Sequence, residues 1–277
     1  MLEALSPHVI RLGLPSHTLP PASYTNSFLI HDASVGVLVD PGFYEAESLS
    51  AVQDALQTTK TNLLKAVLLT HTHQDHVEGL SLLRTAYPEV PVYVHPNELA
   101  RLEPAANLTA LKGERKLTVG NVLIETHFTP GHSPGHLSFY LPEEALVLAG
   151  DLVAGQGSTW VGLPEGDVGE YLTSLDKLRA LKLKLLAPAH GEPTAEPYNK
   201  LNQARGHRLE RLEQVLDALG NDTLSTDDLL KRIYPDIPAE LTALAKGSLL
   251  ALLQHHMQTL KVLHLGEDEK GPYARRR

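Results

Sequence analysis

Histidine and aspartate side chains that could bind metal ions crowd one short segment, residues 71–76. The chain has no cysteine, so a zinc site would be built from imidazole and carboxylate groups. Alternate residues of an extended segment point to the same side, so His71 and His73 can share one ion. Asp75 and His76 follow where the chain turns into a helix and can reach a second ion. Taken alone, the segment could also be a solvated polar loop.

Three more candidate ligands each follow a short apolar run that we expect to be a strand. These are His132 after residues 122–128, Asp151 after residues 145–149 and His190 after residues 185–187. Glycines beside them allow the backbone to bend sharply next to an ion. The same placement at several strand ends favours a shared metal site over a polar loop.

The elements that must position these residues change in kind along the chain. Short apolar runs rich in β-branched residues dominate the first part, and the run 66–69 ends directly before the histidine segment. Helical patterns, among them one over residues 77–87, lie between these runs. This mixture predicts two sheets with helices outside.

After a linker around residues 192–197, most of the chain has a helical pattern. We expect helices over residues 199–219, 226–233 and 241–260, then an apolar run over 262–265 and a turn at Gly266. This order resembles a small winged-helix module, so we predict domains at 1–194 and 195–277. The short basic tail, residues 271–277, is expected to be disordered.

Composition narrows the function classes. No run of 18 or more apolar residues is present, so we expect no membrane span, and residues 1–10 do not read as a secretory signal. With no cysteine either, we expect a cytoplasmic protein. The net charge of −9 belongs to residues 1–194, whereas residues 195–277 are neutral. This balance argues weakly against tight non-specific nucleic-acid binding and leaves the oligomeric state open.

Together these residues resemble the metallo-β-lactamase superfamily over residues 1–194. The resemblance implies an α+β fold, an αββα sandwich with metals at one edge of its two sheets, followed here by a small helical, winged-helix-like domain. It also implies the ligand set, carried over residue by residue. His71, His73 and His132 would hold the first ion, Asp75, His76 and His190 the second, and Asp151 would bridge both.

Two more residues are candidates through the same resemblance. Asp40 matches an earlier superfamily motif and is expected to orient a ligand or a loop of the active site. His136 lies four residues after His132, but Pro134 and Gly135 make a helix there improbable. We therefore interpret His136 as structural or substrate-lining.

The chemistry implied is hydrolysis with two Zn²⁺ ions, for which iron or manganese could substitute. Two ions about 3.5–4 Å apart share a water whose pKa falls toward ~7, which leaves a metal-bridging hydroxide to attack carbon or phosphorus. Asp75 would be catalytic as well as a ligand, because it can orient the nucleophile or handle its proton.

Two branches of the superfamily, which differ in substrate, are candidates. Several segments resemble the group of the mitochondrial β-lactamase-like endoribonuclease, which implies single-stranded RNA as substrate. They are residues 24–29, 150–155, 171–175, 207–210 and 245–250. The alternative is glyoxalase II-like hydrolysis of a small ester or thioester, whose metal motif is the same, although its Asn-Pro-Phe segment and a basic glutathione clamp are missing.

A third class is a nucleic-acid or protein-binding module with a structural metal site. Arg205, Arg208 and Arg211 recur every three residues and could line a substrate groove, or could form a solvated face paired with Glu210 and Glu213. Structural zinc sites are usually closed, whereas this ligand set leaves room for water. The complete set therefore favours an enzyme.

Overall fold

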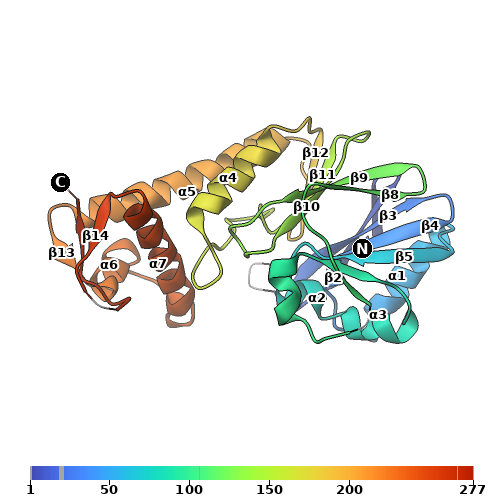
Figure 1. Cartoon of the computed structure of the whole chain (residues 1–277), viewed down its shortest axis with the longest axis horizontal. Coiled ribbons are helices and arrows are strands. Elements are labelled where there is room, and N and C mark those ends of the chain that lie inside the picture. The colour runs from blue at the N-terminus through green and yellow to red at the C-terminus, as the bar shows by residue number, and fades with distance from the viewer. Residues whose placement is uncertain (1, 19–21, 106, 267, 277) are drawn as a thin grey trace.

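Two β-sheets lie face to face in a computed structural model that describes residues 2–18, 22–105, 107–266 and 268–276 (Figure 1). The first sheet has the order β1 (Leu2–Ser6), β2 (Val9–Pro15), β3 (Tyr24–Asp32), β4 (Val35–Val39), β5 (Leu63–Leu68), β6 (Val92–Val94) and β7 (Leu108–Ala110). The second has the order β12 (Leu185–Pro188), β11 (Leu146–Gly150), β10 (Leu137–Leu141), β9 (Val122–Phe128) and β8 (Arg115–Val119). Each sheet has antiparallel pairs and a parallel part.

Helices cover the outer faces of both sheets. The first sheet is covered by α1 (Ala46–Thr58) and α3 (Leu80–Ala86), and the second by α4 (Val168–Arg179) and α5 (Pro197–Leu219). Short helices α2 (Gln74–Val77) and η1 (Pro96–Arg101) lie at the rim. This arrangement confirms the predicted αββα sandwich.

The apolar run over residues 66–69 contributes side chains to two hydrophobic cores, one on each face of the first sheet. In β5 and the residue after it, Ala66 and Leu68 point between the sheets, whereas Val67 and Leu69 point toward α1 and α3. Successive side chains of a strand face opposite sides, so a strand buried on both faces is apolar throughout. The run 66–69 was therefore correctly predicted as a buried strand.

The prediction of a single helix over residues 77–87 is wrong. The chain forms α2 and then α3, with Gly79 between them. A Cβ at Gly79 would lie 2.6 Å from the Pro41 carbonyl oxygen and 2.9 Å from the Phe43 ring, so this glycine lets the two segments meet. The helix is divided by a tertiary contact that the local pattern does not contain.

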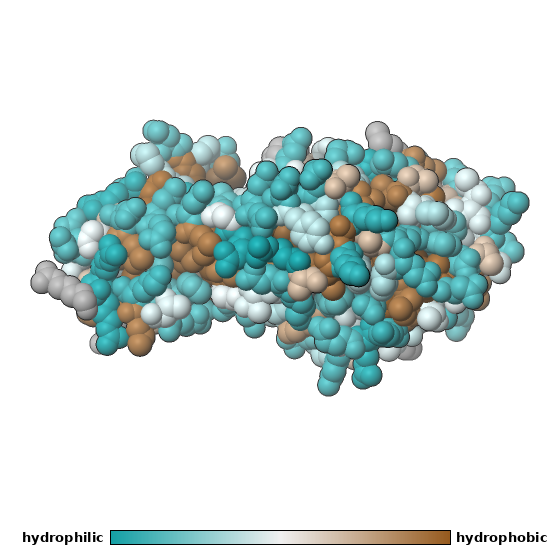
Figure 2. All heavy atoms as spheres, turned by 90° about the horizontal axis from the view of Figure 1, so that it is seen from above, coloured by the Kyte–Doolittle hydropathy of each residue, from teal (hydrophilic) through white to brown (hydrophobic). Residues whose placement is uncertain are grey.

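The C-terminal part forms a second lobe, reached along α5 (Figure 1). It consists of α6 (Thr226–Ile233), η2 (Ala239–Leu241), α7 (Thr242–Gln258) and a small sheet of β13 (Thr223–Leu224), β15 (Tyr273–Arg275) and β14 (Val262–His264). Seen from above, the surface is mostly hydrophilic with scattered apolar side chains, and a notch lies between the lobes (Figure 2). No helix in the described ranges combines the length and apolarity needed to cross a membrane.

The expectation of a disordered tail is wrong for its described residues, 271–276. Tyr273–Arg275 is the central strand of the small sheet and pairs with both β13 and β14. The Tyr273 side chain is buried, and its hydroxyl donates to the Glu269 carbonyl oxygen. One buried aromatic ring and two strand partners order a segment whose composition is basic.

The candidate ligands follow strands whose carboxyl ends lie at one edge of the sandwich. Strands β4 and β5 are parallel, as are β11 and β12, and β9 shares the direction of β11 because β10 is antiparallel to both. Asp40, His71, His132, Asp151 and His190 each come within a few residues of such an end. The topology therefore gathers residues from distant parts of the chain.

Candidate metal centre

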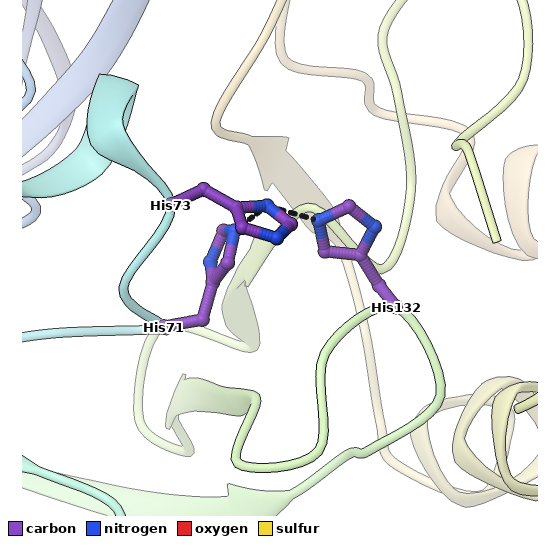
Figure 3. Close-up of side chains that lie close together, drawn as sticks. All are labelled: His71, His73 and His132. Atoms are coloured by element: carbon purple, nitrogen blue, oxygen red, sulfur yellow. Dashed lines mark hydrogen bonds between the residues drawn. The ribbon is translucent and has the colours of Figure 1, made fainter. Parts of the chain in front are cut away.

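Three histidine nitrogens converge at the end of β5 and β9 (Figure 3). His73 Nδ1 lies 2.9 Å from His71 Nε2 and 3.0 Å from His132 Nε2. In a tetrahedral zinc site with Zn–N distances of 2.0–2.1 Å, ligand nitrogens lie about 3.3 Å apart. The spacing of this trio is therefore close to what one small divalent ion requires.

A second group of potential ligands lies beside the first. His190 Nε2 is 3.2 Å from Asp75 Oδ2, and His76 Nε2 is 4.0 Å from Asp75 Oδ1. Asp75 and His76 come from α2, whereas His190 follows β12. These three residues form a potential metal-binding group of their own.

Asp151 lies between the two groups. Its Oδ2 is 3.6 Å from His132 Nε2, and its Oδ1 is 3.4 Å from both His76 Nε2 and His190 Nε2. The two oxygens thus face different groups, which is the position that a bridging carboxylate needs. All seven residues expected to bind metal are brought together in one cluster.

The ring nitrogen that faces away from the cluster has a hydrogen-bond partner in each of the five histidines. The partners are Thr70 Oγ1 for His71, Glu165 Oε2 for His73, Asp40 Oδ2 for His76, the Trp160 carbonyl oxygen for His132 and the Tyr24 carbonyl oxygen for His190. Such partners fix the tautomer, so that the other nitrogen presents its lone pair to the cluster.

Asp40 lies directly behind His76 and is buried. Its Oδ1 accepts the Thr70 backbone N–H at 2.7 Å, and its Oδ2 accepts from the Thr70 hydroxyl at 2.6 Å and from His76 Nδ1 at 3.0 Å. The residue has a φ of 49°, which points to a turn determined by these contacts. Asp40 therefore has the contacts of a residue that orients a ligand.

His136 is fully buried behind Asp151. Its Nδ1 lies 2.9 Å from the Thr129 hydroxyl, and its Nε2 accepts the Asp151 backbone N–H at 3.1 Å. Burial, helped by the nearby His132, lowers the pKa of His136 to about 3, so the ring stays a neutral acceptor. His136 supports the backbone of Asp151 and does not line an open surface.

The donor set fits a bound divalent cation. Within the described part of the chain, His76 Nε2, Asp151 Oδ1 and His190 Nε2 are buried and make no hydrogen bond, although they face one another. Burial alone would lower the pKa of His190, but Asp151 and Asp75 raise it to about 10. Burial alone would raise the pKa of Asp75, but His190 and His76 lower it to about 2. This half of the cluster favours positive charge, which metal ions would supply.

Two glutamates near the cluster carried no signal in the sequence. Glu98, fully buried, accepts from the Thr72 hydroxyl and from the Gly135 N–H at 2.8 Å, so it ties the two histidine-bearing loops together. Glu165 accepts from His73 and pairs with Arg101 at 2.5 Å. Both are separated from their partners by many residues and belong to no motif, so only the fold identifies them.

The arginine stripe on α5 does not form an open basic face. Arg205 pairs with Asp176, Arg208 is buried and donates to the Thr159 carbonyl oxygen, and Arg211 stacks over Tyr234. The suggested pairing with Glu210 and Glu213 is not what the structure shows either. Each arginine has packing or pairing within the protein.

A hollow of about 320 Å³ lies between the loop after β11 and α5. Val153 and Ala154 form its apolar part, and Lys200, Gln203 and His207 its polar part. The same loop contacts the cluster, because the Gly155 N–H donates to the His190 carbonyl oxygen at 2.7 Å. The loop that lines the hollow thus also contacts the backbone of a candidate ligand.

Comparison with known proteins identifies the family of this chain. Residues 20–190 match the Metallo-beta-lactamase superfamily and residues 225–270 the Beta-lactamase associated winged helix domain. The chain is 30% identical to the Lactamase-like protein adaB of Aspergillus niger, over 89% of this chain and 79% of that protein. It is 29% identical to the Atrochrysone carboxyl ACP thioesterase of Aspergillus fumigatus, over 87% and 78%. It is 27% identical to the Beta-lactamase-like protein 2 homolog of Drosophila melanogaster, over 86% and 82%.

A solved structure shows the same fold over the whole length. The metallo-beta-lactamase family protein from Thermus thermophilus superimposes with a TM-score of 0.81 at 23% identity, covering 99% of this chain and 100% of its own. The two matched regions, the αββα sandwich and the His/Asp cluster at its edge agree with one another. The chain belongs to the metallo-beta-lactamase superfamily of hydrolases and carries a beta-lactamase associated winged helix domain.

Proposed function

We propose that the chain is a binuclear metal-dependent hydrolase of thioesters. The observation that carries this proposal is the extent of the likeness to the Aspergillus fumigatus protein named a thioesterase, which covers 87% of this chain. That share is larger than the sandwich alone, so it includes part of the C-terminal lobe. A thioester fits the site because its carbonyl carbon is an electrophile that a hydrolytic metal centre can use.

The proposed ligands are those that the geometry brings together. His71, His73 and His132 would hold one ion, and Asp75, His76 and His190 the other, with Asp151 between them. Zinc is the proposed metal, and iron or manganese could replace it at the same donors. When bound, two such ions would polarise the substrate carbonyl and supply hydroxide at neutral pH.

Asp75 would hold the nucleophile in place. Its pKa of about 2 keeps the carboxylate ionised at neutral pH, so one oxygen can accept a proton from water. Its backbone is fixed from two sides. The Thr25 hydroxyl donates to the Asp75 carbonyl oxygen at 2.8 Å, and Gly42 approaches so closely that a Cβ there would lie 1.8 Å from the same oxygen.

The hollow beside the centre offers a place for the rest of the substrate. Val153 and Ala154, close in sequence to Asp151, could contact an acyl chain, and Lys200 and His207 a polar carrier arm. Lys200 donates to the Gly155 carbonyl oxygen at 2.9 Å and so also supports this loop. A hollow of this size suits a small-molecule arm.

Cleavage of single-stranded RNA is the second candidate. It is favoured by the resemblance of residues 24–29 and 150–155 to the endoribonuclease group, and the chain is similar to a Beta-lactamase-like protein 2 homolog. The engagement of Arg205, Arg208 and Arg211 within the protein weighs against it, because these side chains form no free basic track.

The test compares both substrates on one preparation. Zinc-loaded protein is assayed on a short and a long acyl-N-acetylcysteamine thioester, S-lactoylglutathione and a labelled single-stranded RNA, and its metal content is measured. We expect about two ions per chain, rapid thioester cleavage and slow RNA cleavage. Asp75→Ala should abolish turnover, whereas Asp222→Ala, at an exposed pair with Arg232, should not. Turnover of RNA alone would overturn the thioesterase proposal.

A further inference from the structure

We infer that α7 of the C-terminal lobe supports the first metal site through residues 159–166, here called the linking segment. This segment follows β11 and precedes α4 in the sandwich. The inference rests on the proposed ligand assignment but not on the substrate. It makes the C-terminal lobe a structural part of the metal centre.

On the metal side, the linking segment contacts two of the three histidines of the first site. The Trp160 carbonyl oxygen accepts from His132 Nδ1 at 2.8 Å, and Glu165 Oε2 accepts from His73 Nε2 at 3.0 Å. A displacement of the segment would therefore move the hydrogen-bond partners of both rings. Such partners determine how well a ligand nitrogen is aimed at the ion.

On the other side, the same segment is hydrogen-bonded to the first half of α7. The Trp160 indole N–H donates to the Leu244 carbonyl oxygen at 3.0 Å, and the Leu163 backbone N–H donates to the Gly247 carbonyl oxygen at 3.1 Å. Trp160 thus contacts α7 through its side chain and a proposed ligand through its backbone. One residue joins the two lobes at the site.

The fit between the segment and α7 depends on two glycines. A Cβ at Gly247 would lie 3.2 Å from both the Leu163 carbonyl oxygen and the Trp160 ring. A Cβ at Gly162 would lie 2.4 Å from the Trp160 ring and 2.9 Å from the Gly247 backbone. A glycine in a helix interior lowers helix stability by about 1 kcal/mol relative to alanine. The close contact with the linking segment explains why a glycine is nevertheless present at position 247 of α7.

Further contacts hold both ends of the segment. Arg208 of α5, only 4% exposed, donates to the Thr159 carbonyl oxygen at 2.9 Å and lies over the Tyr171 ring. At the other end, the Asp167 backbone N–H donates to the Gly131 carbonyl oxygen at 2.9 Å, directly beside His132. Between these ends, Trp160 and Leu163 are hydrogen-bonded to α7, whereas Glu165 also pairs with Arg101 of η1. Trp160 and Glu165 are therefore positioning residues.

The test uses the full chain and reads the metal site directly. Trp160→Phe keeps an aromatic ring but removes the N–H to Leu244, and Gly247→Val crowds the contact. Gly206→Ala, on α5 with open space around it, is the matched control. Each variant is titrated with Co²⁺, recording the visible absorption of the bound ion, and with Zn²⁺ against a chelator. Circular dichroism checks folding.

We expect Trp160→Phe and Gly247→Val to weaken ion binding at the first site by up to about 10-fold, the lower end of the effect of losing an outer partner, because they displace the Trp160 carbonyl oxygen without removing it. The Co²⁺ spectrum should change as well. Gly206→Ala should match the unmodified chain. If Trp160→Phe, folded, shows the unmodified affinity and spectrum, the inference is wrong, whatever Gly247→Val does. If the unmodified chain binds fewer than two ions, the ligand assignment itself fails, which is a distinct result.

Discussion

Replacing Asp40 by asparagine would remove the charge behind His76 while keeping the shape of the side chain. The carboxylate accepts hydrogen bonds from the Thr70 N–H, the Thr70 hydroxyl and His76 Nδ1. Asparagine has one acceptor oxygen, so its NH₂ group must face one of these donors. If the NH₂ group faces His76, the ring is driven to the tautomer with hydrogen on Nε2, the nitrogen that points into the cluster.

The magnitude follows from the bond that is lost. A hydrogen bond to a buried charged group contributes about 1.5–3 kcal/mol, and loss of an outer partner typically lowers metal affinity 10–100-fold. The energy of the lost hydrogen bond and the loss in affinity agree with each other, because a factor of ten in affinity corresponds to about 1.4 kcal/mol. We therefore expect the second site, which contains His76, to bind zinc about 10–100-fold more weakly, with a smaller change at the first.

The assay is competition between the protein and a chromophoric zinc chelator, fitted with two dissociation constants. Asp222→Asn is the control, because Asp222 is exposed and pairs only with Arg232 at 2.9 Å among the described contacts. Circular dichroism establishes that Asp40→Asn folds. The reasoning is refuted if a folded Asp40→Asn protein keeps both dissociation constants of the unmodified chain.

Three further predictions test other parts of the structure. Gly42→Ala places a Cβ 1.8 Å from the Asp75 carbonyl oxygen, so its thermal stability and metal content should fall well below those of Gly206→Ala; equal values would contradict the contact. The pKa of His190 is about 10 without metal, and although burial would lower the pKa of His76, Asp151 and Asp40 raise it well above its usual value. A ligating imidazole is neutral, so zinc binding at pH 7.5 should release at least one proton and strengthen as the pH rises toward 10; calorimetry in two buffers counts the protons, and none released would exclude protonated rings. Tyr273→Ala should lower the free energy of unfolding by about 3–5 kcal/mol, as for other buried aromatic residues, measured by urea denaturation; an effect near zero would mean that the last strand does not pack.

Much of the candidate site could be predicted from the sequence because its chemistry is local. The density of His and Asp over residues 71–76 indicates ligands without knowledge of the fold. His132, Asp151 and His190 each follow an apolar run, and a strand end is recognisable from periodicity alone. This common placement favoured a site shared with residues 71–76, but the assignment of each residue to one ion or the other followed only from the family resemblance.

The missed features depend on contacts between distant residues. Glu165 acquires a role only because it lies beside His73, which is far away in the chain. Gly79 divides a helix because Pro41 and Phe43 pack against it, and the basic tail forms a strand because Tyr273 is buried. No local pattern encodes these contacts, so propensity and periodicity could not reveal them.

The sequence by itself determined which donors are available and in what order they occur along the chain. Residues 71–76 and the absence of cysteine already limit the site to imidazole and carboxylate, because ligand chemistry belongs to the side chain. The tertiary structure decided which nitrogen each ring presents, since that depends on partners such as Asp40 and the Trp160 carbonyl oxygen. It also brought α7 against the linking segment, because packing of two distant segments is a property of the whole fold.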